Sequence, residues 1–230
     1  CVRIGDLSEP CLYSVPGATQ TVLLVGDSHA VHLSQTIIES ANGQLWNAAV
    51  WGKGGCPIQF EQSLEKRLTD RCIEQNLDIL NWVKVNKPSV VIVSQFVLAE
   101  FSQNDLRKAL SLLKSFTPNV LLVENTPVFP DESRFMVRLP LLFPRYDPPK
   151  FFLQSKMLVT DKFASDELSE WARENQIDTL DFSPLFCSDN LCRRFSDAGW
   201  LYSDEDHLSL VGAKLAAPQF DDYLKRIPGR

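Results

Sequence analysis

The stretch TVLLVGDSHA, residues 21–30, decides how the rest of the chain is interpreted. Its first five residues are almost all apolar or β-branched, which is typical of a short strand buried on both faces. Gly26 then permits a tight turn, and Asp27 and Ser28 are residue types that often begin helices. The sequence therefore predicts a buried strand that ends at Gly26 and a helix that begins at Ser28.

The same alternation of strand and helix continues along the chain. Further buried strands are predicted at residues 44–51, 88–96, 119–127 and 177–182. Helical patterns are predicted at residues 28–41, 61–86, 104–116, 155–175 and 209–225. Strands that alternate with helices form a parallel sheet covered by helices on both faces. We therefore expect an α/β fold with three layers, α/β/α, around a five-stranded parallel sheet.

Length and composition favour one globular domain. With 230 residues, 44% of them hydrophobic, the chain is long and apolar enough to bury a sizeable core. Residues 1–20 are rich in turn formers and are predicted to be an N-terminal extension or linker packed on a domain that covers residues 21–230. The apolar runs are too short to cross a bilayer. The net charge of −6, with scattered basic residues, argues against nucleic acid as a partner.

The six cysteines fall into three local pairs. These are Cys1 with Cys11, Cys56 with Cys72, and Cys187 with Cys192. None has the C-x-x-C spacing of a zinc or redox site, so we interpret them as three disulfides formed in an oxidising compartment. Sequence alone does not determine the pairing, and six buried free thiols in a cytosolic protein is the alternative.

Ser28 is the candidate nucleophile. It would lie at the carboxyl end of the first parallel strand, where ligands bind in such sheets. The free N–H groups at the start of the following helix would face an oxyanion formed there. The alternative is that Ser28 or Asp27 only caps the helix.

A serine nucleophile needs a base, and the chain has three histidines. His29 and His32 share the helix of Ser28, and His32 is expected to point away from the strand end. His207 lies in a loop before the last helix, and Asp204 three residues earlier can reach back to its ring and leave the other ring nitrogen for Ser28.

The competing acid in this loop is Asp206. Because adjacent side chains diverge, we expect it to be the less suitable partner for His207. The alternative for the whole segment SDEDH, residues 203–207, is a solvated acidic loop that contains a histidine by chance.

The two motifs together resemble the SGNH, or GDSL, hydrolase superfamily. There, Gly-Asp-Ser near the N-terminus and Asp-x-x-His before the last helix are the first and fifth sequence blocks. A narrower resemblance is to the extracytoplasmic SGNH domains fused to membrane acyltransferase-3 proteins. It is carried by four motifs in the same order, GDSHA at 26–30, GCP at 55–57, TPVFP at 126–130 and DEDHLSLVGA at 204–213.

The resemblance implies a flavodoxin-like SGNH fold and a catalytic role for each matching residue. Ser28 would be the nucleophile, His207 the base and Asp204 the residue that orients the base. The second block would supply an oxyanion donor from a glycine. Gly52 is the first candidate and Gly54 is its rival, and either could equally be a plain turn residue.

The third block departs from the superfamily pattern Gly-x-Asn-Asp. Here the stretch is VSQF, residues 93–96, so that Gln95 replaces the asparagine and Phe96 the aspartate. Gln95 is a candidate oxyanion donor through its longer amide side chain. Loss of one such donor costs roughly 3 kcal/mol of barrier, which puts efficient hydrolysis in doubt.

Other residues near these motifs are interpreted structurally. The aromatic residues Trp46, Trp51, Trp200 and Tyr202 are expected to pack in the core rather than stack on a sugar. The basic residues Lys53, Arg193 and Arg194 are expected to be solvated rather than to bind an anionic polysaccharide. No metal cluster or phosphate loop is visible, so we expect neither metal nor cofactor.

The resemblance implies an O-acetyltransferase that passes an acetyl group through an acyl-serine to a cell-envelope carbohydrate, such as lipopolysaccharide O-antigen, peptidoglycan or another exported glycan. The donor would be delivered by a membrane acyltransferase domain of the same full-length protein. That places the domain in the periplasm or on the extracytoplasmic face of the membrane, and the isolated domain is expected to be a monomer. The alternatives are a secreted carbohydrate acetylesterase with the same triad and a glycan-binding module with a weak site.

Overall fold

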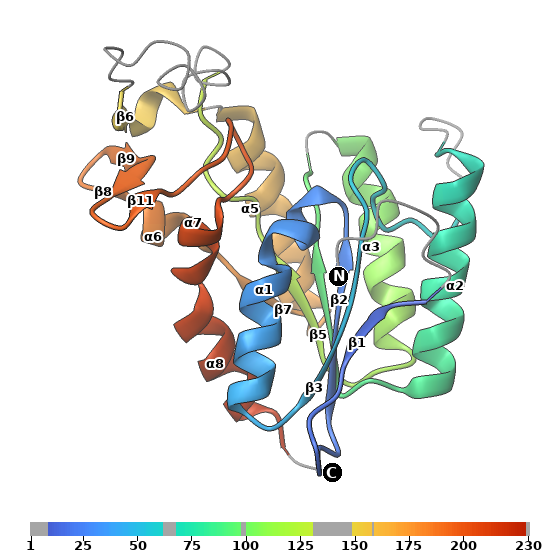
Figure 1. Cartoon of the computed structure of the whole chain (residues 1–230). Helices are drawn as coiled ribbons and strands as arrows, with labels where there is room; N and C mark the ends of the chain where they lie inside the picture. Colours follow the sequence, from blue (N-terminus) through green and yellow to red (C-terminus); the bar gives the residue numbers. More distant parts are fainter. Residues whose placement is uncertain (1–8, 62–67, 98–99, 131–148, 158, 229–230) are drawn as a thin grey trace.

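A six-stranded, mostly parallel sheet forms the centre of the computed structural model (Figure 1). The structure describes residues 9–61, 68–97, 100–130, 149–157 and 159–228. The sheet order is β1-β3-β2-β4-β5-β7. Its strands are β1 (Cys11–Tyr13), β2 (Thr21–Gly26), β3 (Asn47–Gly52), β4 (Val90–Ser94), β5 (Val120–Val123) and β7 (Asp178–Leu180).

The predicted α/β fold is confirmed, and the five predicted strands pair in parallel. The sixth strand, β1, was not predicted. It pairs antiparallel with the edge of β3, with Cys11 opposite Val50 and Tyr13 opposite Ala48. Three residues are too few to show a two-residue period, so backbone pairing and not a sequence pattern reveals this strand. A domain boundary at residue 20 stays a prediction, although β1 belongs to the main sheet.

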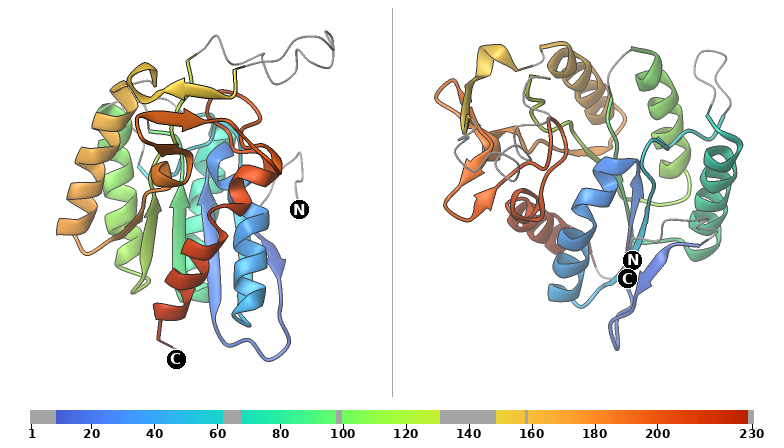
Figure 2. Two further views of the ribbon diagram at one scale, coloured as in Figure 1. Left: turned by 90° about the vertical axis from the view of Figure 1, so that its left-hand side faces the viewer. Right: turned by 45° about the horizontal axis from the view of Figure 1, so that its top comes forward.

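Helices cover both faces of the sheet (Figures 1 and 2). One layer contains α1 (Ser28–Gly43) and α8 (Ala217–Arg226), and the other contains α2 (Asp70–Asn86), α3 (Glu100–Lys114) and α5 (Val159–Glu174). The two faces of the sheet form two hydrophobic cores, one beneath α1 and α8 and one beneath α2, α3 and α5. Within β2, Val22 and Leu24 pack into the former, and Leu23 and Val25 pack into the latter. Because both faces of β2 are fully buried, its sequence is a continuous apolar run instead of an alternating one.

The last predicted helix is interrupted. Residues 209–225 contain α7 (Leu210–Lys214) and then α8, which begins at Ala217. Pro218 explains the break, since its ring would clash with the carbonyl of Lys214 in a continuous helix. It is tolerated in the first turn of α8, where its missing N–H would have no partner.

Several small elements lie together on one side of the sheet, near its carboxyl end. A three-stranded sheet has the order β6-β9-β8, and β10 pairs with β11 (Figure 1). The bounds of these elements are β6 (Phe151–Leu153), η2 (Gln154–Lys156), α6 (Ser183–Phe186), β8 (Cys187–Ser188), β9 (Leu191–Arg193), β10 (Phe195–Ser196) and β11 (Gly199–Trp200). None of these strands was predicted, because none is flanked by a longer apolar run in the sequence.

Two of the three predicted disulfides lie within the described residues. Cys56 is bonded to Cys72 at the start of α2, and Cys187 is bonded to Cys192 across β8 and β9. Cys11 is disulfide-bonded as well, and its predicted partner, Cys1, lies outside the described residues. In the described part of the chain, no helix is both long and apolar enough to span a bilayer.

The carboxyl end of β2 is packed tightly against β4. Gly26 has a φ of +147°, and a Cβ placed on it would lie 1.7 Å from the carbonyl oxygen of Ser94. No other residue type fits there without moving one of the two central strands. This close approach brings the residues after β2 and those after β4 to the same point of the sheet edge, which is where Ser28 lies.

Candidate active site

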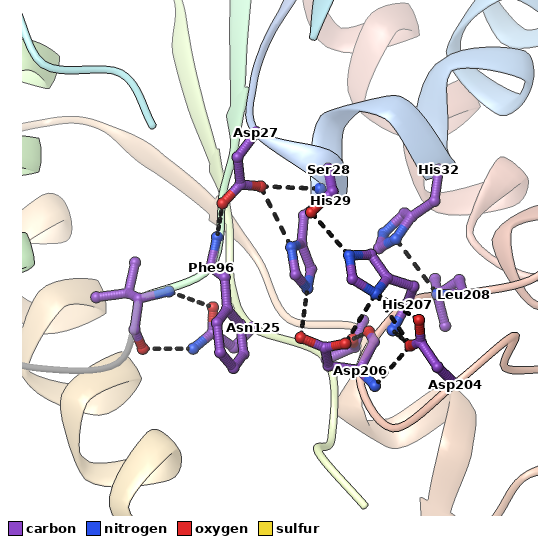
Figure 3. Close-up of polar contacts among 12 residues, drawn as sticks. Asp27, Ser28, His29, His32, Phe96, Asn125, Asp204, Asp206, His207 and Leu208 are labelled. Atoms are coloured by element: carbon purple, nitrogen blue, oxygen red, sulfur yellow. Dashed lines mark hydrogen bonds and ion pairs between the residues drawn. The ribbon is translucent and has the colours of Figure 1, made fainter. Parts of the chain in front are cut away.

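The segments that follow β2, β4 and β5 and the loop of residues 203–209 contribute side chains to one site at the carboxyl edge of the sheet (Figure 3). Ser28 enters this site as the first residue of α1 and is half-buried. His207 and Asp204 enter it from the loop that precedes α7. The topology thus brings residues from opposite ends of the chain together at the position where parallel α/β sheets bind ligands.

Asp27, and not Ser28, caps α1. The Asp27 Oδ1 atom accepts a hydrogen bond of 2.8 Å from the backbone N–H of His29. Its Oδ2 atom accepts one of 3.0 Å from the backbone N–H of Phe96, after β4. Burial alone would raise the pKa of Asp27, but its contacts with His29 and the Phe96 N–H outweigh burial and lower it. The cap therefore leaves the hydroxyl of Ser28 available for another partner.

Ser28, His207 and Asp204 form a continuous hydrogen-bonded chain (Figure 3). The Oγ of Ser28 lies 2.7 Å from Nε2 of His207. On the other side of the ring, Nδ1 lies 2.9 and 3.0 Å from the two carboxylate oxygens of Asp204. This is the geometry in which an imidazole takes a proton from a serine while a carboxylate orients the ring.

The electrostatics of the site favour a charged His207. Hydrogen bonds to Asp204 and then Asp206 raise the pKa of His207 to about 10. Burial raises the pKa of Asp204, but hydrogen bonds from the ring and backbone N–H of His207 outweigh this and hold it well below its usual range. Removal of the proton from His207 is therefore the condition for its action as a base.

The side chains of Asp206 and His207 do not diverge as expected, whereas the ranking of Asp206 below Asp204 as partner of the ring stays a prediction. Its Oδ1 atom lies 2.8 Å from Nδ1 of His207. The backbone N–H groups of Asp206 and His207 both donate to Oδ1 of Asp204, at 3.2 and 2.8 Å. This turn bends the loop around the Asp204 side chain, so that two carboxylates converge on one ring nitrogen.

The other two histidines also lie in the site. His29 is buried, with its ring centroid 4.9 Å from that of His207. Nδ1 of the His32 ring accepts a hydrogen bond of 3.3 Å from the backbone N–H of Leu208. Burial, and then the charges of the other two histidines, lower the pKa of His32 well below its usual value. His32 is thus a neutral acceptor that holds the loop behind His207.

The two candidate oxyanion glycines occupy different places. A Cβ on Gly52 would lie 3.0 Å from a methyl carbon of Val31, so this glycine allows β3 to pack against α1. A Cβ on Gly54 would lie 4.0 Å from the Cβ of Ser28. The N–H of the intervening Lys53 already donates to the carbonyl of Gly26 at 3.1 Å. Gly54 is therefore the glycine beside the nucleophile.

Gln95 is held by the segment that follows β3. Its amide oxygen accepts a hydrogen bond of 2.7 Å from the backbone N–H of Ile58, and the residue is buried. The side chain thus links the ends of β3 and β4. Its role as an oxyanion donor stays a prediction.

Several residues of the site were not predicted to have a role. Asn125 holds the segment after β4 in place through two hydrogen bonds with the backbone of Val97. Thr126 donates to the carbonyl of Asp206 at 3.3 Å. Arg194, expected to be solvated, is fully buried and donates to the carbonyl of Asp204 at 2.7 Å. These contacts join different segments of the chain, so local sequence patterns do not reveal them. Of the three residues, Thr126 alone belongs to a motif that the sequence analysis recognised, TPVFP.

The aromatic residues near the site pack as expected. Trp46, Trp51 and Tyr202 are buried in the two cores. Trp200 is half-buried and packs edge-on against Phe195, with ring centroids 5.2 Å apart.

Ligand atoms suited to a metal ion also gather here. Those of His29, Asp206 and His207 lie within 4.8 Å of one another, as do those of Asp204, Glu205 and Asp206. Side-chain atoms of His29, Asp206 and His207 also contact carboxylates or imidazole nitrogens of the site directly.

The comparisons with known proteins agree with this architecture. A family model described as the SGNH domain fused to AT3 domains matches residues 1–222. The periplasmic domain of a lipopolysaccharide acetyltransferase from Salmonella ser. Paratyphi A is similar in structure, with a TM-score of 0.67, 14% sequence identity, and coverage of 92% of this chain and 86% of that chain. An acetylxylan esterase from Geobacillus stearothermophilus gives a TM-score of 0.50 at 12% identity, with coverage of 93% and 96%. No curated protein sequence matches the chain.

A fluorophosphonate serine probe tests whether Ser28 is activated. We expect one adduct on the wild-type protein, none on Ser28→Ala, and labelling slowed by about 10²-fold or more in His207→Ala, because the base is lost. Intact-protein mass spectrometry measures the adduct. The matched control is Ser34→Ala, which removes another α1 hydroxyl, one that bonds the carbonyl of Val31. An unlabelled wild-type protein, shown to be folded, would contradict an activated serine.

The pH dependence of this labelling should follow the proton on His207. The rate should rise with pH as the ring, whose pKa is raised from 6.5 to about 10, becomes neutral.

A group whose pKa is raised on folding stabilises the fold fully below its unfolded pKa, and that contribution is lost as pH rises through the folded pKa. Urea unfolding should therefore show a loss of stability between pH 6.5 and about 10. His207→Gln should lack this loss, and an identical slope in the variant would assign it to other groups.

Proposed function

Because this chain belongs to the SGNH domains that are fused to AT3 domains, we propose that it transfers acetyl groups to a carbohydrate through an acetyl-Ser28 intermediate. The observation that carries the proposal is the continuous contact from Ser28 through His207 to Asp204. A serine with a positioned base and an orienting acid is the arrangement that forms acyl-enzymes.

Each half-reaction balances with these groups alone. In the first, Nε2 of His207 takes the proton of Ser28 as Oγ bonds to the acetyl carbon. The bond from that carbon to the donor oxygen breaks, and His207 returns the proton to the leaving oxygen. In the second, His207 takes the proton of a sugar hydroxyl as its oxygen bonds to the acetyl carbon. The bond from that carbon to Oγ of Ser28 breaks, and His207 returns the proton to Oγ.

The oxyanion of each tetrahedral intermediate needs donors beside Ser28. The backbone N–H of Ser28 at the start of α1 and that of Gly54 are the pair we propose, and Gln95 is the third candidate. Gly54 is preferred to Gly52 because of its place beside the nucleophile. The disulfide from Cys56 to Cys72 closes the segment just after Gly54 and would help to hold its N–H in place.

Family membership also supports the proposed partner and location. An AT3 domain of the same full-length protein would deliver the acetyl group, and the SGNH domain would act on the extracytoplasmic side of the membrane. The disulfides fit an oxidising compartment. The structural likeness to a lipopolysaccharide acetyltransferase domain, though it shows the fold alone, favours an envelope glycan such as O-antigen over a soluble sugar.

Hydrolysis is the second candidate function. Ser28 is half-buried, so water as well as a sugar hydroxyl can reach an acetyl group bound to it. The fold is shared with an acetylxylan esterase. The same triad serves both reactions, and the acceptor alone distinguishes them.

Acetyl transfer can be tested on the 230-residue chain with p-nitrophenyl acetate as the donor and O-antigen or peptidoglycan fragments as acceptors. We expect p-nitrophenol release to accelerate with acceptor, and mass spectrometry to show the acetylated sugar. Ser28→Ala should lower both by about 10³-fold or more. Release without an acetylated sugar would indicate an esterase. No acetyl-enzyme, with equal glycan binding by Ser28→Ala, would indicate a binding module.

The oxyanion role of Gly54 can be tested with a matched pair of variants. Gly54 lies at the second position of a turn in which Cys56 N–H donates to the carbonyl of Lys53, a position that accepts proline. Gly54→Pro removes the N–H and should lower the acetylation rate of Ser28 by about 10²–10³-fold. Gly54→Ala keeps the N–H and should retain most of the activity. Equal rates in the two variants would return the role to Gly52 or Gln95.

A further inference from the structure

The ring of His29 lies between two carboxylates (Figure 3). Its Nδ1 atom is 3.2 Å from Oδ1 of Asp27, the residue that caps α1. Its Nε2 atom is 3.8 Å from Oδ2 of Asp206, in the loop that carries His207. The His29 side chain is only 6% exposed, so solvent contributes little to its contacts.

The Nε2 atom of His29 is buried and has no hydrogen-bond partner within the described residues. If it carried no proton, its lone pair would face a carboxylate across 3.8 Å, which is unfavourable in a buried site. With a proton on each nitrogen, the ring donates toward Asp27 at one end and Asp206 at the other. A modest closing of the 3.8 Å gap would complete the second hydrogen bond.

Asp206 connects this ring to the base. While Oδ2 faces His29, Oδ1 lies 2.8 Å from Nδ1 of His207. Thr126 holds the Asp206 carbonyl, and the ring of Phe96 stacks on His29 with an interplanar angle of 7°. Asp206 is therefore contacted by His207, His29 and Thr126, whereas a residue of a solvated loop would face water.

We propose that Asp206 is a second carboxylate partner of His207, and that His29, anchored by Asp27, holds it in place through a doubly protonated ring. Asp206 and His29 are positioning residues, because they act through His207. The proposal rests on the proposed acyl transfer at this site and adds to it a second carboxylate and a cation that set the protonation of the base.

The charges around His207 determine the expected effects. Asp204 and Asp206 face it from its own loop, and Ser28, His29 and His32 face it from α1. Behind the loop, the buried Arg194 donates to the carbonyl of Asp204. Among these groups, Asp206 favours the protonated form of His207, and a positive His29 beside Asp206 opposes that effect.

The pH profile of serine labelling tests the proposal with two variants of opposite sign. Asp206→Asn should move the rising limb to lower pH by about one unit or more, as expected when an adjacent opposite charge is removed. His29→Gln should move it to higher pH. The double variant should match Asp206→Asn, because His29 acts through Asp206. Ser34→Ala, which removes an α1 hydroxyl that bonds the carbonyl of Val31 outside this cluster of charges, is the control and should leave the limb unmoved.

The two acids can also be compared directly. If both acids serve His207, the Asp204→Asn variant should retain part of the labelling rate. The double variant Asp204→Asn/Asp206→Asn should then have a labelling rate well below the one obtained by multiplying the two single effects. Strictly multiplicative effects, or a limb unmoved in Asp206→Asn, would overturn the proposal.

Nuclear magnetic resonance gives a readout independent of activity. The chain has only three histidines, so ¹⁵N-histidine labelling gives three pairs of ring-nitrogen signals that single variants assign. We expect both ring nitrogens of His29 to be protonated near neutral pH, and Nε2 to lose its proton in Asp206→Asn. An unprotonated Nε2 in the wild-type protein would overturn the proposal, as would a change of these signals on chelator treatment, which would indicate a metal ion in place of the proton.

These outcomes separate the positioning role from the proposed function. If the His207 titration shifts as expected but no sugar is acetylated, the positioning role stands and acyl transfer fails. If sugar is acetylated while the titration is the same in wild type, His29→Gln and Asp206→Asn, the positioning role fails and acyl transfer stands.

Discussion

The Asp27 carboxylate is the interaction on which the site depends. One oxygen caps α1, and the other accepts the backbone N–H of Phe96 after β4. Because the cap is provided by Asp27, the neighbouring hydroxyl of Ser28 is not used to begin the helix. The same carboxylate contacts the ring of His29. Removing it would therefore disturb the helix end, the segment after β4 and the histidine cluster together.

The loop of residues 203–209 supplies the other half of the site and is held by buried contacts on its inner side. Arg194 and Thr126 bind backbone carbonyls of the loop, and His32 accepts the N–H of Leu208. Such anchoring holds the imidazole of His207 within reach of Ser28 although 178 residues separate them along the chain. A rigid loop also retains the geometry while the ring gains and loses a proton, which preorganises the reaction.

The predictable parts of this structure are those that local sequence encodes. Five central strands followed from continuous apolar runs, and their parallel order followed from the intervening helices. That order places Ser28 at the sheet edge, and the Asp-x-x-His spacing put Asp204 against the ring of His207. The strand β1 and the strands around β9 could not be predicted, because two or three residues show no period and their pairing is set by distant segments.

The position of the Asp206 side chain beside His207 has a physical cause. Adjacent side chains diverge in extended chain, but here two backbone N–H groups bind Asp204 and curl the loop. Similarly, Gly52 ends the strand as the family pattern suggests, whereas the turn after it carries Gly54 to Ser28. In both cases a turn of the backbone determines which residues of the segment lie beside His207 or Ser28.

The charge balance of the site explains why a second histidine is useful. Asp27, Asp204 and Asp206 are three carboxylates near a serine on which negative charge must develop during acyl transfer, and His32 is held neutral. When His207 is neutral, the form that acts as a base, these acids are opposed by the α1 N-terminus, by Arg194 behind the loop and by a positive His29. A cation at His29, away from the reacting atoms, offsets the carboxylates without occupying the space that donor and sugar must share. The site can then contain two acids beside its base and still favour an oxyanion at Ser28.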